Sequence, residues 1–179
     1  MVDPGSGPFL FDTSAESWLA RTRSNWLREY LSLHQLHISA ITVLERSRGY
    51  SLLYSSAPEN RKKKIEGMRV AWLSGLGRVW PLDGAVAVVA GEIMALLPDP
   101  PTPPRRSHQL AESRSERLSR WRFDGMIAAT ALVARLPLIH NNAADFEAIR
   151  SAIERSPGRF PDLGPLELIR CRLLRETVH

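Results

Sequence analysis

RFDGMIAATALVARLPLIHNNAADFE, residues 122–147, is the stretch that decides the fold. Two aspartates, Asp124 and Asp145, lie near its ends. The residues from 125 to 134 are almost all apolar and predict a buried helix, and the apolar run 137–140 predicts a strand. If the helix leaves the carboxyl edge of a parallel sheet and the strand returns to it, both aspartates meet at that edge. Open α/β sheets hold their functional sites there.

The composition is that of a globular protein of about one domain. The chain has 179 residues, of which 44% are hydrophobic and 24% are charged. Its longest apolar stretch, 85–97, is shorter than the roughly 20 residues that a membrane span needs, and the first residues lack a signal-peptide pattern. We therefore expect a single domain over residues 1–179, located in the cytoplasm, with no membrane association.

Charge and cysteine content narrow the functional classes. Lys plus Arg minus Asp plus Glu is 24 − 19 = +5, which favours a polyanionic partner such as a nucleic acid. Cys171 is the one cysteine of the sequence, so an internal disulfide or a cysteine-rich zinc cluster within one chain is excluded.

Short apolar runs alternate with helical patterns along the whole chain, which indicates an α/β protein. Besides 137–140, strands are predicted at 9–11, 36–39, 78–82 and 166–169. Helices are predicted at 15–33, with a break near 22–24, and then from 40, at 59–73, at 83–97 and from 142. A Pro/Arg-rich segment at about 98–122 cannot continue a helix through its prolines, and we interpret it as an insertion within the domain.

Four acids fall at equivalent positions along this pattern: Asp12, Glu45, Asp124 and Asp145. Each follows a predicted strand or begins a helix, so all four are expected at the carboxyl edge. Placing two carboxylates within about 4–5 Å costs roughly 3–4 kcal/mol at an effective dielectric of about 20, which a proton or a cation must relieve. Helix N-termini beneath Asp124 and Asp145 are expected to keep these two ionised. All-oxygen ligation suits Mg²⁺ or Mn²⁺.

A divalent cation held by carboxylates beside basic residues is suited to hydrolysis of phosphate esters. The metal can lower the pKa of a bound water and neutralise charge on the leaving oxygen. A free carboxylate can accept the proton of that water.

Five motifs in a fixed order resemble the PIN-domain nucleases, specifically the VapC type of bacterial toxin. They are FLFDT at 9–13, HISAITVLE at 37–45, WPLD at 80–83, FDGMIAATA at 123–131 and LPLIHNNAADFE at 136–147. The resemblance covers about residues 9–169, which is nearly the whole chain.

This resemblance implies a PIN-like three-layer α/β fold with a parallel sheet of four or five strands flanked by helices. It implies a Mg²⁺- or Mn²⁺-dependent endoribonuclease that leaves a 5′-phosphate and acts as the toxin of a toxin–antitoxin pair. The catalytic and metal-binding residues would be Asp12, Glu45, Asp124 and Asp145. The implied partners are an RNA substrate, a second copy in a homodimer, and an antitoxin whose helix lies in an apolar groove and whose tail blocks the acidic site.

Four further residues are candidates for contacts with the substrate or with the acids: Thr13, Thr42, His140 and Asn142. His140 departs from the family, which commonly has Thr or Ser there, so it is expected either to contact substrate or to form a structural hydrogen bond at the strand end. Asn142 is also expected to cap the helix that follows it. Two other functions remain open: a non-catalytic PIN-like module that binds RNA or protein, and a DNA-directed nuclease of related fold.

Overall fold

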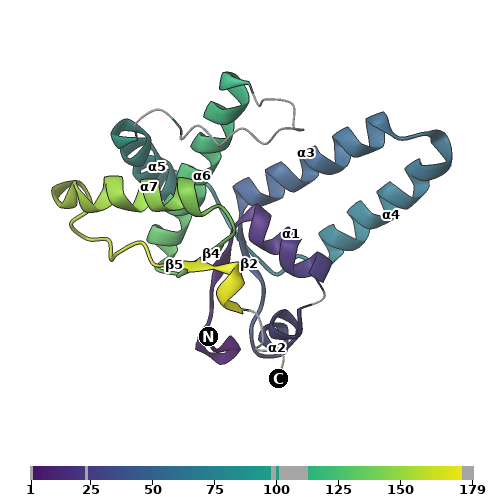
Figure 1. The fold of residues 1–179 in the computed structure, drawn as a ribbon, viewed down its shortest axis with the longest axis horizontal. Helices are drawn as coiled ribbons and strands as arrows, with labels where there is room; N and C mark the ends of the chain where they lie inside the picture. Colours follow the sequence, from purple (N-terminus) through teal and green to yellow (C-terminus); the bar gives the residue numbers. More distant parts are fainter. Residues whose placement is uncertain (1, 23, 98–99, 101–112, 175–179) are drawn as a thin grey trace.

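The computed structural model describes residues 2–22, 24–97, 100 and 113–174, and contains a five-stranded parallel sheet in the order β3-β2-β1-β4-β5 (Figure 1). The strands are β1 (Leu10–Phe11), β2 (His37–Ser39), β3 (Arg78–Trp80), β4 (Leu138–His140) and β5 (Leu168–Arg170). Every neighbouring pair is parallel. The prediction of an α/β fold with a parallel sheet is therefore confirmed.

Helices connect the strands. They are α1 (Thr13–Thr22), α2 (Asn25–Leu33), α3 (Ala40–Ser56), α4 (Glu59–Ser74), α5 (Gly84–Leu96), α6 (Arg114–Ala134) and α7 (Ala143–Glu154), with short 3₁₀ turns η1 (Pro4–Ser6), η2 (Pro157–Arg159) and η3 (Cys171–Leu174). The predicted break between the first two helices is confirmed: Ser24 starts α2, and its side chain accepts a hydrogen bond from the backbone N–H of Leu27.

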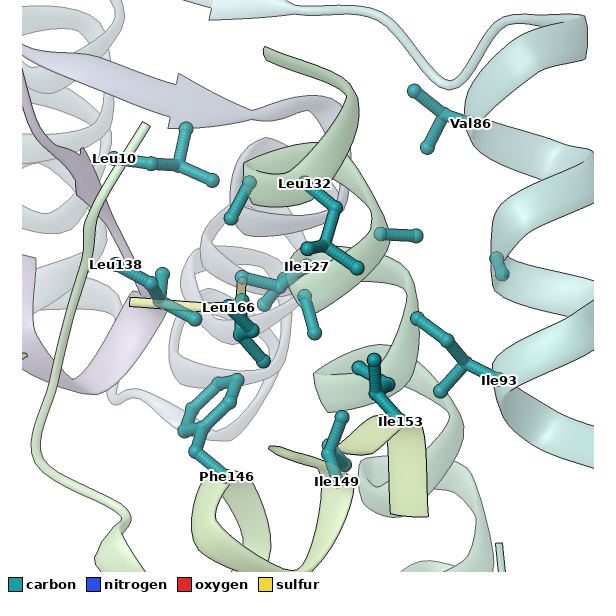
Figure 2. Packing of buried hydrophobic residues seen from close by; sticks show 14 of the residues in the cluster. Leu10, Val86, Ile93, Ile127, Leu132, Leu138, Phe146, Ile149, Ile153 and Leu166 are labelled. Atoms are coloured by element: carbon teal, nitrogen blue, oxygen red, sulfur yellow. The ribbon is translucent and has the colours of Figure 1, made fainter. Parts of the chain in front are cut away.

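Alternating side chains on the strands divide the core into two clusters, one on each face of the sheet. Leu10 and Leu138 pack with residues of α5, α6 and α7, and Figure 2 shows part of this cluster. Phe11 and Ile139, one position further along their strands, pack with α1, α2 and η3 on the other face. The sheet is thus the middle of three layers. Each fully buried large apolar side chain contributes about 1.5–3 kcal/mol to this packing.

The antiparallel pair α3 and α4 extends away from the body of the molecule (Figure 1). Several of its large apolar side chains are exposed: Leu44, Leu52, Leu53, Tyr54, Met68, Val70 and Leu73. Met68, in the predicted helix 59–73, is 47% exposed, although its three-residue spacing from the buried Ile65 is that of one helical face and favours burial. Among the described residues, no other element covers these apolar side chains of α3 and α4.

Helix α6 begins well before the predicted start at Gly125. Ser113 and Glu116 form a capping box, in which the Ser113 side chain accepts from the Glu116 backbone and the Glu116 side chain accepts from the Ser113 backbone. The final part of the predicted insertion at 98–122 is therefore the first part of α6. Residues 98–99 and 101–112 of that insertion lie outside the described residues.

Helix α5 is the most apolar helix of the fold. Asp83 caps it, because its Oδ1 accepts a hydrogen bond from the Val86 backbone N–H at 3.0 Å. Within the part of the chain that the structure describes, no helix is both long enough and apolar enough to cross a membrane.

Candidate active site

The four predicted acids lie on segments that the sheet brings to one edge. Asp12 follows β1 directly, Glu45 lies in the second turn of α3, Asp124 lies in α6, and Asp145 lies in the first turn of α7. Strand β1 lies between β2 and β4, so the segments that follow these strands start side by side. Helix α3 also packs against α1 and α6. The parallel topology therefore gathers residues that are far apart in the sequence.

The raised pKa of Asp124 shows that the other three acids lie close to it. Its side chain is only 7% exposed, and burial is the main reason that its pKa lies well above the usual value. The negative charges of Asp145, Asp12 and Glu45 raise this pKa further, in that order. The expectation that a helix N-terminus keeps Asp124 ionised is wrong, because α6 starts at Arg114 and Asp124 lies in its interior. Asp145 is in the first turn of its helix, as predicted.

Asp12 is held firmly at the start of α1. Its Oδ1 accepts a hydrogen bond from the Ala15 backbone N–H at 2.5 Å, and its Oδ2 accepts one from the Ser14 hydroxyl at 2.8 Å. Burial nevertheless raises the pKa of Asp12 to about 7, with a smaller contribution from the charge of Glu45. The carboxyl group of Asp12 therefore titrates near neutral pH.

Thr13 connects α1 to α3 through Glu45. The Thr13 hydroxyl donates a hydrogen bond to Glu45 Oε2 at 2.5 Å. Burial raises the pKa of Glu45, whereas this hydrogen bond and the charge of Arg48 lower it. Thr42, the other candidate hydroxyl, is fully buried and pairs with the hydroxyl of Ser39, which caps α3.

Asn142 bridges two of the acids. Its Nδ2 donates to Asp124 Oδ2 at 3.1 Å and to Asp145 Oδ2 at 2.5 Å. It occupies the N-cap position of α7, but its side chain makes no capping hydrogen bond, so that part of the prediction is wrong. The amide instead donates to both carboxylates and bridges them. These two hydrogen bonds go to carboxylate oxygens that could otherwise bind a cation.

Arg120 is a site residue that the sequence did not reveal. Its Nε lies 3.5 Å from Asp145 Oδ2. It precedes Asp124 by four residues, which places both on one face of a continuous helix. This spacing would have been informative if the helix had been predicted to begin before residue 120.

His140 ends β4 beside the acids and has an exposed fraction of 0%. Within the described part of the chain, neither ring nitrogen has a hydrogen-bond partner of acceptable geometry, although the backbone of Asn142 lies near the ring and acts to raise the pKa of His140. Burial dominates and lowers the pKa of His140. Its ring packs against Phe146, with centroids 5.1 Å apart. The structural contact expected at this strand end is thus a weak one, to the backbone of Asn142.

The chemistry of the donor set fits a hard divalent cation. The groups are carboxylates and one amide, and the mutual repulsion that raises the pKa of Asp124 would be relieved equally by a proton or by a cation. In the arrangement described, no group of three or more His, Cys, Asp or Glu side chains within residues 2–22, 24–97, 100 and 113–174 is placed so that it could hold a metal ion. Asn142 occupies oxygens of two of the four acids.

A family comparison agrees with this fold and site. The model of the PIN domain matches residues 9–151, which include all four acids. The chain therefore belongs to the PIN domain family, and the resemblance drawn from the sequence motifs is confirmed. A comparison with curated proteins gave no match.

Solved structures with a similar fold include three complexes. DNA-bound VapBC from Salmonella typhimurium has 20% identity and a TM-score of 0.52, covering 91% of this chain and 97% of that one. VapBC2 from Rickettsia felis bound to a promoter DNA fragment has 17% identity and a TM-score of 0.53, covering 90% and 97%. FitAB bound to an IR36 DNA fragment has 19% identity and a TM-score of 0.50, covering 96% and 100%. At these identities the likeness establishes the fold.

Proposed function

We propose that the chain is a Mg²⁺- or Mn²⁺-dependent endoribonuclease that hydrolyses RNA phosphodiester bonds at its four-carboxylate site. One observation carries the proposal: the charges of Asp12, Glu45 and Asp145 all raise the pKa of the buried Asp124. Carboxylates placed close together at one edge of the sheet repel one another and so lower the stability of the folded state. A bound cation would offset this repulsion. The basic composition favours a polyanionic substrate.

In this proposal Asp12, Glu45, Asp124 and Asp145 hold the metal, which when bound would activate water and neutralise charge developing on the phosphate. Asn142 fixes the relative positions of Asp124 and Asp145 through its two hydrogen bonds. Thr13 fixes Glu45 in the same way. If the metal leaves one of these four carboxylates without a direct contact, that carboxylate would accept a proton from the attacking water.

We also propose that the protein is the toxin of a toxin–antitoxin pair and acts in the cytoplasm. The similarity in fold to two structures, VapBC and VapBC2, supports this assignment. Exposed apolar side chains on α3 and α4, such as Leu52, Leu53 and Val70, would suit an amphipathic helix of an antitoxin. A homodimer and a single domain over residues 1–179, with the insertion at about 98–122, are parts of the same proposal.

The deciding experiment compares RNA cleavage by the wild type, freed of any antitoxin, with cleavage by an Asp124→Asn variant in Mg²⁺ or Mn²⁺. Glu92→Gln is the matched control, because Glu92 is a partly exposed acid that pairs with Arg159 away from the four acids. We expect cleavage by the wild type and by Glu92→Gln, and a loss of at least about 100-fold in Asp124→Asn. Equal cleavage by the wild type and Asp124→Asn, or none by the wild type, would defeat the proposal.

Thermal unfolding during a titration with Mn²⁺ distinguishes the proposed nuclease from a non-catalytic binding module. A clustered acidic site should gain thermal stability from Mn²⁺ by preferential binding to the folded state, whereas a module that only binds RNA or protein need not. Competition with single-stranded DNA of the same sequence addresses a DNA-directed nuclease. If the protein cleaves the DNA in preference to the RNA, the substrate class is DNA.

A further inference from the structure

A small cavity lies at the carboxyl ends of β4 and β5, next along the chain to Asn142, which contacts two of the acids. It has a volume of about 200 Å³ and is lined by His140, Asn141, Ala143, Arg170 and Arg172. We call it the His140 pocket. Its walls come from the ends of β4 and β5, the start of α7 and the turn η3. Because β4 and β5 are parallel and His140 is in register with Arg170, the two side chains leave the sheet at the same edge.

His140 is the feature of this pocket that calls for a ligand. Its side chain is completely buried, yet among the residues that the structure describes neither Nδ1 nor Nε2 has a hydrogen-bond partner of acceptable geometry. Buried polar atoms in folded proteins nearly always have a hydrogen-bond partner. A group that entered the cavity and accepted a hydrogen bond from the ring would supply the missing contact.

The charges around the pocket favour an anion. Arg170 and Arg172 both line it, and Arg170 shares the single carboxylate of Glu147 with Arg150. Arg150 also contacts Glu154, at 3.8 Å, so these five side chains carry three positive and two negative charges. The two arginines that line the pocket, together with the side chains that their ion pairs involve, therefore carry a net positive charge.

The start of α7 adds to this preference. Ala143 is the first residue of a 12-residue helix and lines the pocket. The side chain of Asn142 makes no capping hydrogen bond there, because it is engaged with the acids. Backbone N–H groups and the positive end of a helix dipole attract phosphate oxygens at such a position.

We propose that the His140 pocket binds a phosphate of the RNA strand that flanks the scissile phosphate. This inference rests on the proposed function, since it needs RNA at the four-acid site. Asn141 joins the two sites: His140 and Asn141 face the pocket, while the next residue, Asn142, contacts Asp124 and Asp145. A strand whose scissile phosphate lies at the acids would thus present a neighbouring phosphate to the arginines.

The test measures RNA binding and cleavage separately. Binding of a single-stranded RNA is measured in an Asp124→Asn background, across a range of salt concentrations, with Arg172→Gln added. Arg155→Gln is the control, because Arg155 is exposed, lies at the other end of α7 and carries the same charge. We expect Arg172→Gln to weaken binding about 5–10-fold and to reduce the salt slope by about 0.7, the value for one phosphate contact on a single strand. Arg155→Gln should leave both unchanged.

A second measurement follows the ring nitrogens of His140 by NMR during titration with the same RNA and with an acidic peptide. Shifts with RNA that are lost in Arg172→Gln support the pocket. Equal salt slopes for Arg172→Gln and its parent, or shifts with the acidic peptide and not with RNA, would overturn it, the latter in favour of a protein carboxylate. If the wild type still cleaves RNA in that case, the pocket is wrong and the proposed function stands. If the wild type neither binds nor cleaves RNA, both fail.

Discussion

The hydroxyl of Thr13 donates a hydrogen bond to Glu45 Oε2 at 2.5 Å, and so joins the first residue of α1 to a carboxylate on α3. This contact lowers the pKa of a carboxyl group that burial raises. It therefore helps to keep Glu45 ionised in an environment that disfavours charge.

A Thr13→Val substitution should move the acidic limb of the pH–activity profile to higher pH. Valine keeps the shape of threonine but cannot donate, so the pKa of Glu45 rises and a higher pH is needed to ionise it. We expect a clear loss of cleavage at pH 6 that largely recovers at pH 8. Thr22→Val is the control, because the Thr22 hydroxyl donates to the backbone carbonyl groups of Trp18 and Leu19 in its own helix. A uniform loss at every pH would contradict this role.

Without metal, the protein should lose stability as the pH rises from about 4 to about 7. The pKa of Asp12 rises from 3.8 in its unperturbed state to about 7 in the folded state, so the folded state binds more protons in this window. Stability is then lost with increasing pH, by about 1.4 kcal/mol for each pKa unit of difference. Thermal unfolding in a chelator, with Asp12→Asn as the variant that should flatten the trend, measures this. A melting temperature that rises from pH 5 to pH 7 would contradict it.

An Asp124→Asn variant should be more stable than the wild type at pH 8 in the absence of metal. The substitution removes a buried carboxyl group whose ionisation is opposed by burial and by three neighbouring acids, and the new side chain can still accept from Asn142. We expect a gain of at least about 1 kcal/mol in the free energy of unfolding. The same variant should lose the stabilisation that Mn²⁺ gives to the wild type.

Asp83→Asn provides the contrast for this measurement. It changes the same functional group at a helix cap away from the acids, where the carboxylate accepts from the Val86 backbone. Asparagine is as good a cap as aspartate, so we expect a change of only a few tenths of a kcal/mol. If Asp83→Asn raises stability as much as Asp124→Asn does, the gain does not come from relieved repulsion.

The sequence was sufficient for the sheet and for the edge at which the acids lie. Five short apolar runs were predicted as strands, and the structure places strands within or overlapping each of them. Local apolar patterning is enough for this because buried parallel strands are nearly continuous apolar runs. The same topological rule predicts that residues following such strands share an edge.

The electrostatics of the site could not be read from the sequence. Asp124 looked like the start of a helix because the apolar pattern begins at Gly125, but a capping box at Ser113 and Glu116 extends the helix toward the N-terminus. Its protonation then depends on burial and on three partners from other elements. Asn142 likewise looked like a cap, and only the folded arrangement shows that its amide bridges two acids.

Replacing His140 by phenylalanine should stabilise the metal-free protein. His140 is fully buried, and within the described residues neither ring nitrogen has a hydrogen-bond partner of acceptable geometry. Its ring already packs on Phe146, so an apolar ring of similar size removes a polar group that burial disfavours. We expect a gain of about 1 kcal/mol in the free energy of unfolding by denaturant. His37→Phe is the matched control on a neighbouring part of the sheet, because His37 Nδ1 accepts a hydrogen bond from Trp80 Nε1 at 3.3 Å. That control should lower stability, and a loss in His140→Phe as large as the loss in His37→Phe would show that His140 is a structural residue.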